Sequence, residues 1–104
     1  MVALNSIQFQ YDTDDVGGSK PHHVLTARVG DEQVGKLRWS ATSVRGIDVP
    51  EEHQRQGIAT ALWEHGQSLA AENPKIPAPK HSSDRTRAGD AWARSVGGRL
   101  PRRV

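Results

Sequence analysis

The chain has 104 residues, 35% of them hydrophobic, and it contains no cysteine. This length supports one hydrophobic core, so we expect a single domain over residues 1–104. The absence of cysteine excludes disulfides, thiolate metal sites and a cysteine nucleophile. No apolar run approaches the roughly 20 residues that span a bilayer, and the N-terminus lacks the apolar core of a signal peptide. We therefore expect a soluble, cytoplasmic protein without a membrane partner.

The formal net charge of +2 hides an uneven distribution along the chain. Residues 1–74 carry 6 Lys/Arg and 10 Asp/Glu, whereas residues 75–104 carry 8 Lys/Arg and 2 Asp/Glu. A basic C-terminal third can serve the phosphates of a cofactor or contact nucleic acid. A solvated basic tail is the plainer interpretation, above all for Arg102 and Arg103.

Alternating apolar and polar residues predict four strands in the first half of the chain. They cover Ser6–Tyr11, Val24–Val29, Val34–Ser40 and Val44–Val49. A short loop with Gly30 and Asp31 joins the second to the third, which is a hairpin signal. The residues expected to point inward are Ile7, Phe9, Tyr11, Leu25, Ala27, Val29, Leu37 and Trp39.

The segment from Asp12 to His23 is expected to be a loop, because it is rich in aspartate, glycine and Pro21. His22 and His23 are adjacent, so their side chains would diverge on a strand. No third ligand is spaced to join them, and we expect no metal site there.

The fourth strand leads into the most informative stretch of the chain, Ile47–Trp63. It consists of an apolar strand end, a proline, a polar loop, Gly57 and a helix of small and apolar residues. Such a helix start leaves backbone N–H groups unpaired and pointing one way, which makes an anion site suited to phosphate. A Walker A loop is excluded because no Gly-Lys-Ser/Thr follows, and a Rossmann loop because only one glycine is present. An ordinary strand–loop–helix connection remains the alternative.

This stretch resembles motif A of the GNAT superfamily of acyl-CoA N-acyltransferases. Counted from Val49, Gln54 is at plus five, Gly57 at plus eight and Ala59 at plus ten, as in the family. The proline is displaced, because Pro50 is at plus one and the family usually has it at plus two. The resemblance implies that this backbone holds the pyrophosphate of coenzyme A, with small residues where phosphate approaches. The cofactor-binding residues that it implies are Ile47, Val49, Gln54, Arg55, Gln56, Gly57, Ile58, Ala59 and Thr60.

The second half of the chain predicts two helices around an extended segment. The first helix is expected from about Gly57 to Glu72, with Ile58, Leu62 and Leu69 buried and Trp63 in the core. The proline-rich segment Lys75–Ser83 can form at most a short edge strand. A last helix is expected through Val96, capped by Ser82-Ser83-Asp84 or Thr86 and ended by Gly97-Gly98.

The expected order of elements resembles the GNAT core over residues 24–98. Val34-Gly35-Lys36-Leu37 resembles the family's Val-Gly-x-Leu run, and Gly89-x-x-Trp92-Ala93-x-x-x-Gly97-Gly98 more loosely resembles a later signature. The expected fold is α/β of an α+β-like kind, a mixed, mostly antiparallel sheet with two helices. The two helices that the family places between its first two strands have no room here. The resemblance therefore implies an open acceptor side, suited to a protein or other bulky acceptor, or a site completed by a second subunit.

The resemblance implies an enzyme that transfers acetyl from acetyl-CoA to an amine, without a metal. The family's frequent general acid, a tyrosine in the last helix, falls on Ala93, which cannot protonate a leaving thiolate. The only tyrosine, Tyr11, lies in the first expected strand. Direct transfer also needs a base near neutral pH, and histidine suits that task best. The titratable candidates near the expected cleft are Asp48, Glu51, His53 and His81, with His81 the first to test.

Two other interpretations stay open. A GNAT-like scaffold without chemistry could serve as a binding or regulatory module. A small nucleic-acid-binding protein could use the basic C-terminal third, which has the charge but lacks a recognised motif. Coenzyme binding separates the first two hypotheses from the third, and turnover separates an enzyme from a module.

Overall fold

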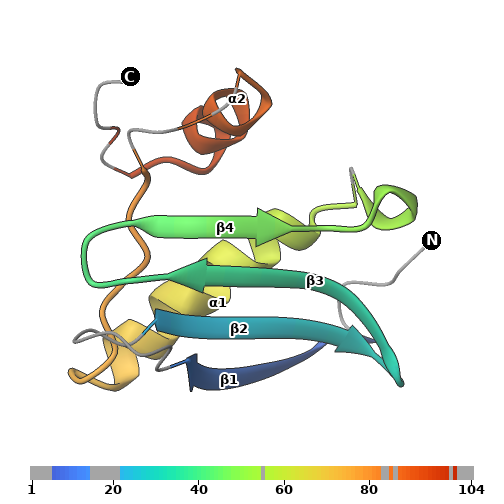
Figure 1. Ribbon diagram of the computed structural model, residues 1–104, viewed down its shortest axis with the longest axis horizontal. Coiled ribbons are helices and arrows are strands. Elements are labelled where there is room, and N and C mark those ends of the chain that lie inside the picture. Colours follow the sequence, from blue (N-terminus) through green and yellow to red (C-terminus); the bar gives the residue numbers. More distant parts are fainter. Residues whose placement is uncertain are drawn as a thin grey trace.

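The computed structural model describes residues 6–14, 22–54, 56–82, 85, 87–98 and 100 (Figure 1). The elements in chain order are β1 (Gln8–Asp14), β2 (His22–Val29), β3 (Glu32–Trp39), β4 (Val44–Asp48), the 3-10 turn η2 (Glu51–His53), α1 (Ile58–Glu72) and α2 (Arg87–Val96). An antiparallel sheet with two helices is the class that the sequence predicts. The first five and last four residues, and the expected caps at Ser83, Asp84 and Thr86, lie outside the described residues.

The sheet is an antiparallel meander in the order β1-β2-β3-β4. The hairpin between β2 and β3 turns at Gly30, whose φ of 59° lies in the left-handed region that favours glycine. The predicted loop from Asp12 to His23 is too long, because β1 continues to Asp14, which pairs with His22. Cross-strand pairing with β2 keeps these polar residues extended on an edge strand, where their side chains need no burial.

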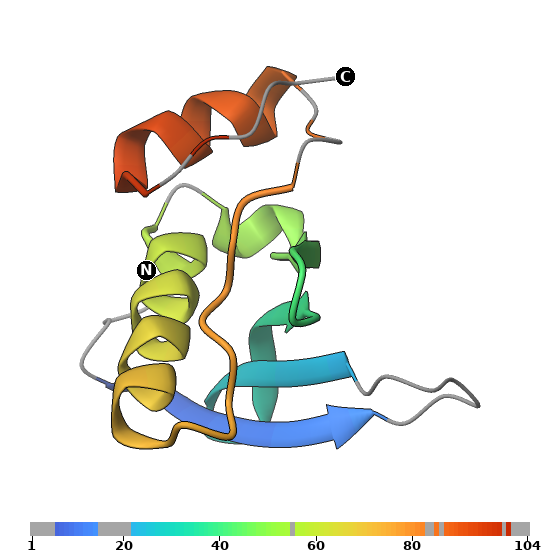
Figure 2. The ribbon, with the colours of Figure 1, turned by 90° about the vertical axis from the view of Figure 1, so that its left-hand side faces the viewer.

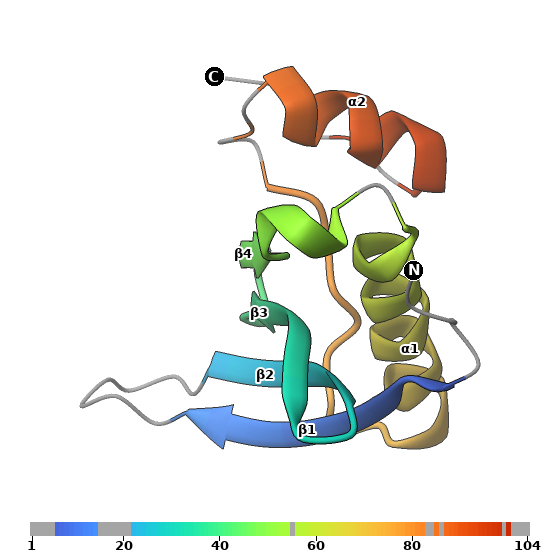
Figure 3. The ribbon, with the colours of Figure 1, turned by 90° about the vertical axis from the view of Figure 1, so that its right-hand side faces the viewer.

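Helix α1 covers one face of the sheet, as the two side views show (Figures 2 and 3). The core between them contains Ile7, Leu25, Ala27, Val34, Leu37, Trp39, Ile58, Leu62 and Ile76. Gly35 allows the close approach, because a Cβ built on it would lie 2.7 Å from Ile58 Cγ2. The glycine of the predicted Val-Gly-x-Leu run therefore has a packing role on β3.

Helix α1 begins and ends close to its predicted limits. Gly57 precedes it with φ 79°, and Asn73 closes it by donating its N–H to Leu69 O at 2.9 Å. Trp63 is buried, as expected. The last helix ends at Val96 before Gly97 and Gly98, which both have positive φ, and this confirms the predicted stop. Neither described helix is long and apolar enough to cross a bilayer.

The proline-rich segment 73–82 runs between α1 and the end of the sheet towards α2 (Figure 2). Side chains of the sheet and of α1 donate hydrogen bonds to two of its carbonyl groups. Trp39 Nε1 donates to Pro77 O at 2.7 Å, and Gln67 Nε2 donates to Pro79 O at 2.8 Å. Val44 N donates to Lys80 O at 2.7 Å, and among the described residues this is the one backbone bond between the segment and β4. No strand forms there in the described part, in line with the three prolines that lack an N–H.

Candidate functional site

The start of α1 has the geometry of a backbone anion site. Gly57 caps the helix in the left-handed conformation, without a side-chain capping bond and without an acidic residue in the first turn. The first intrahelical bond runs from Ala61 N to Gly57 O at 2.9 Å. The N–H groups of Ile58, Ala59 and Thr60 therefore have no partner within the helix and point beyond its end, where the helix dipole is positive.

The loop that enters α1 is fastened by its own glutamines. Gln54 Nε2 donates to Val49 O at 3.0 Å, and Gln56 Nε2 donates to Glu52 O at 3.3 Å. These two predicted cofactor residues thus shape the loop between β4 and α1. Arg55, between them, lies outside the described residues.

A cleft opens where β4 and the proline-rich segment separate. It has a volume of about 260 Å³ and is lined by Val44, Arg45, Gly46, Ile47, His81, Ser82, Arg85, Gly89, Trp92 and Ala93. Helix α2 forms its far wall and is tied to the first turn of α1, because Trp92 Nε1 donates to Thr60 Oγ1 at 3.1 Å. The same tryptophan therefore lines the cleft and contacts the first turn of α1.

The predicted cofactor residues fall into two groups around this cleft. Ile47 lines it from β4, whereas Gly57, Ala59 and Thr60 stand at the start of α1. The side chain of Ile58 is in the core, so only its backbone can face a ligand. Val49 also packs against the core and is not among the lining residues.

His81 is held inside an aromatic cluster beside the cleft. Its ring stacks on Trp63 with 4.1 Å between centroids and 5° between planes, and Trp92 packs edge-on against both rings. Its Nε2 donates to Gly97 O at 2.7 Å, and the residue is 4% exposed. These contacts give His81 a packing role in joining the end of α2 to α1.

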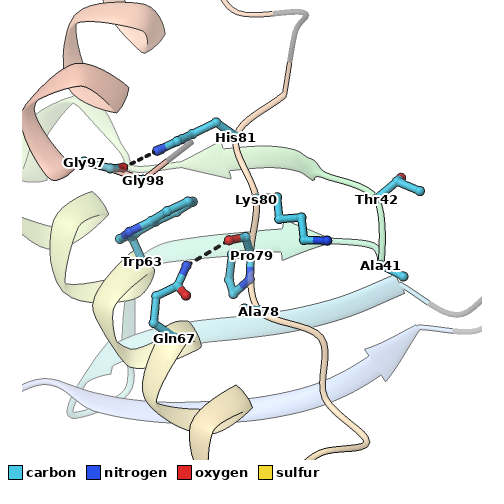
Figure 4. Close-up of a pocket in the computed structure, with 10 residues that line it drawn as sticks. All are labelled: Ala41, Thr42, Trp63, Gln67, Ala78, Pro79, Lys80, His81, Gly97 and Gly98. Atoms are coloured by element: carbon cyan, nitrogen blue, oxygen red, sulfur yellow. Dashed lines mark hydrogen bonds between the residues drawn. The ribbon is translucent and has the colours of Figure 1, made fainter. Parts of the chain in front are cut away.

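A larger cavity lies on the other side of His81 (Figure 4). Its volume is about 670 Å³, and its lining residues are Ala41, Thr42, Trp63, Gln67, Ala78, Pro79, Lys80, His81, Gly97 and Gly98. Figure 4 shows the Lys80 side chain extending towards the loop with Ala41 and Thr42. Sequence reasoning missed this cavity, because it joins four segments whose proximity no local pattern reveals.

Position 93, where the resemblance places a general acid, has no group that can donate a proton. Ala93 is fully buried and lines the cleft from α2. Tyr11 lies on β1, and the two strands between β1 and β4 put it about 14 Å from the cleft at the usual strand spacing. Its hydroxyl is hydrogen-bonded to His23 Nδ1 at 2.6 Å, and burial raises the pKa of the Tyr11 phenol.

The remaining base candidates lie in different surroundings. Asp48 and Glu51 are exposed, whereas His53 is buried and its Nε2 donates to Glu32 Oε1 at 3.1 Å. Glu32, Glu52 and His53 bring one potential metal ligand atom each within 4.8 Å of one another. No local sequence pattern predicts this group, because Glu32 at the start of β3 and His53 are far apart along the chain.

Comparisons of the chain with protein-family models, with curated proteins and with solved structures give no match. The case for a particular activity therefore depends on the motif residues and on the arrangement of the cleft.

Proposed function

We propose that the protein binds acetyl-CoA between β4 and α2 and transfers its acetyl group to an amine. The observation that carries this proposal is that the cleft lies next to the uncapped start of α1. Trp92 lines the cleft and also donates a hydrogen bond to Thr60 in the first turn of α1. Coenzyme A has a phosphate-bearing head and an extended arm that contains amides. Its site therefore needs an uncapped helix start for the phosphates next to a cleft for the arm. The residue pattern from Val49 to Ala59, which resembles motif A, supports the same assignment.

Each part of the coenzyme has a place in this arrangement. The pyrophosphate accepts hydrogen bonds from the N–H groups of Ile58, Ala59 and Thr60, and the helix dipole favours its charge. The pantetheine arm lies in the cleft along Gly46 and Ile47, where its amides pair with the backbone of β4 in the manner of an added strand. The thioester then faces the end of the cleft lined by His81.

The transfer itself is a direct acyl exchange. The acceptor ammonium gives one proton to a base, the neutral nitrogen attacks the thioester carbonyl carbon, and a C–N bond forms as the C–S bond breaks. The thiolate takes up a proton, so the products are an acetamide, coenzyme A and one released proton. With alanine at position 93, the general acid is missing, and a rate about 10²-fold lower is expected than with a positioned acid.

The test of coenzyme binding adds a negative charge at the start of α1. Aspartate at position 59 stabilises the helix through the dipole but repels a pyrophosphate. Calorimetry with acetyl-CoA should show binding to the wild type and at least a tenfold weaker affinity for Ala59→Asp, because one such charge contact is worth about 1–2 kcal/mol. Ser68→Asp places the same charge on an exposed position of α1 and serves as the control. Equal affinity in all three proteins would refute the proposed phosphate position.

Turnover decides between an enzyme and a non-catalytic binding module. Tight acetyl-CoA binding with no transfer to any amine in a broad panel would favour the module. Failure to bind acetyl-CoA would bring nucleic acid forward as the alternative partner. In that case two of the basic residues of the C-terminal third are already engaged, since Arg85 and Arg94 both pair with Asp90 at 3.0 and 2.9 Å.

A further inference from the structure

The sheet face opposite α1 carries a charged pocket. Its volume is about 250 Å³, and it is lined by Lys36, Arg38, Arg45, Gly46 and Asp48, which we call the basic pocket. The strand register pairs Lys36 with Asp48 and Arg38 with Gly46, so these four residues share one face of β3 and β4. Their neighbours Leu37 and Trp39 point the other way, into the core under α1. In the described part of the chain no helix covers this face (Figures 2 and 3).

The basic pocket and the cleft adjoin along β4, an edge strand of the described sheet. Arg45 and Gly46 line both of them. A Cβ built on Gly46 would have no atom within 4 Å, so the space beside this residue is open. A molecule seated in the basic pocket therefore lies next to the place assigned to the pantetheine arm.

The charge of the basic pocket favours an anion. Three cationic side chains face one carboxylate, and Arg28 and Asp12, further along the same face, add one charge of each sign. Arg45 is directed by a bond from its Nη2 to Thr42 Oγ1 at 3.2 Å. Arginine can bind a carboxylate through two parallel hydrogen bonds, which gives both attraction and orientation.

We propose that the basic pocket binds carboxylate groups of the acceptor, so that the preferred acceptor is an amine with carboxylates close to the reacting nitrogen. This inference rests on the acetyl-transfer function proposed above and names its substrate class. Lys36, Arg38 and Arg45 attract the carboxylates and orient the acceptor beside the cleft. An acidic amino acid and the amino terminus of an acidic peptide share this chemistry.

Binding is tested first without any coenzyme. Titrations of the ¹⁵N-labelled full chain use aspartate and a C-terminally amidated tripeptide that begins with two aspartates. Asparagine amide and the corresponding amidated diasparagine peptide, which carry no carboxylate, are the neutral controls. Acidic ligands should shift the backbone amide signals of Lys36, Gly46 and Asp48, and neutral ligands should not. If the acidic peptide causes larger shifts than aspartate, the site is assigned to the amino terminus of a polypeptide. If the two ligands cause equal shifts, it is assigned to a free amino acid. Equal shifts with acidic and neutral ligands would overturn the proposal.

Variants then test the acceptor preference in the transfer reaction. Lys36→Gln with Arg45→Gln should lower the kcat/KM ratio of acidic to neutral acceptor by about tenfold or more, because two charge contacts are lost. Lys75→Gln removes an exposed lysine that lines none of the three cavities and should leave the ratio unchanged.

The outcomes separate this proposal from the function on which it rests. Acetyl-CoA binding with no preference for acidic acceptors would overturn the acceptor class and leave coenzyme binding intact. Shifts at the basic pocket without any acetyl-CoA binding would overturn its role as an acceptor site and the proposed transfer together. Acidic preference that disappears in the double variant would support both.

Discussion

At the scale of single residues, His81 shows how chemistry and packing compete for the same side chain. The sequence favours it as a catalyst, because histidine titrates near neutral pH and this one precedes the last helix. In the structure one face of its ring stacks on Trp63, Trp92 packs edge-on against it, and its Nε2 donates to Gly97 O. Serving as an acid would require the Nε2 proton to leave that carbonyl, so the geometry favours a structural role.

Removal of the His81 ring should therefore lower the free energy of unfolding, rather than act on the acetyl-transfer step itself. His81→Ala loses a buried aromatic stack and a hydrogen bond, and we expect the free energy of unfolding to fall by about 2–4 kcal/mol. Urea unfolding followed by tryptophan fluorescence measures this. His65→Ala, which removes a stack on the half-buried Phe9, is the comparison and should cost less. Unchanged stability combined with lost acetyl transfer would instead make His81 a catalytic residue.

A second histidine gives the protein a pH-dependent stability. Burial lowers the pKa of His23, and the neighbouring charge of His22 lowers it further. The unfolded chain then binds the proton more readily, so stability is full above the ordinary histidine pKa of about 6.5 and falls as the pH drops below it. Thermal unfolding between pH 7.5 and 5 should show this loss, and His23→Gln should reduce the slope. A slope that is identical in His23→Gln would assign the dependence to other groups.

At the scale of elements, two strand glycines have opposite surroundings. A Cβ on Gly35 would meet Ile58 Cγ2 at 2.7 Å, whereas a Cβ on Gly46 would meet nothing within 4 Å. Gly35→Ala should lower the free energy of unfolding by about 1–3 kcal/mol through overpacking, while Gly46→Ala should be neutral or slightly stabilising. Equilibrium unfolding in urea measures both. Similar effects of the two substitutions would contradict the packing of α1 on β3.

The elements themselves were largely predictable, and their relative placement was not. Alternation identified the four strands because one face of the sheet is buried, and glycines marked the start of α1 and the end of α2. The predicted loop ran into β1 and β2 because residues such as Asp12 and Thr13 extend a strand through pairing alone. The cleft, the His81 cluster and the group around His53 depend on contacts between distant segments, which leave no local pattern.

At the scale of the whole molecule, the structure is a sheet with one covered and one open face. The open face follows from the short connection between β1 and β2, in which only residues 15–21 lie between the two strands. The resemblance to the GNAT core implied an open side where the family has two helices, and the described residues leave this face of the sheet without a helix. Which charges would gather there could not be predicted, since the basic pocket depends on the register of β3 against β4.

The meander order of the strands bears on how the molecule assembles. Every strand pairs with its neighbour in the sequence, so the sheet forms through local pairings, and α1 follows β4 after the loop that contains η2. Such local pairing is fast, and chains fold from the N-terminal end as they emerge during synthesis. The proline-rich segment and α2, which form the second wall of the cleft, arrive last. The sheet with α1 can thus be in place before the cleft exists, and a local opening of α2 would dismantle the cleft while leaving the sheet paired.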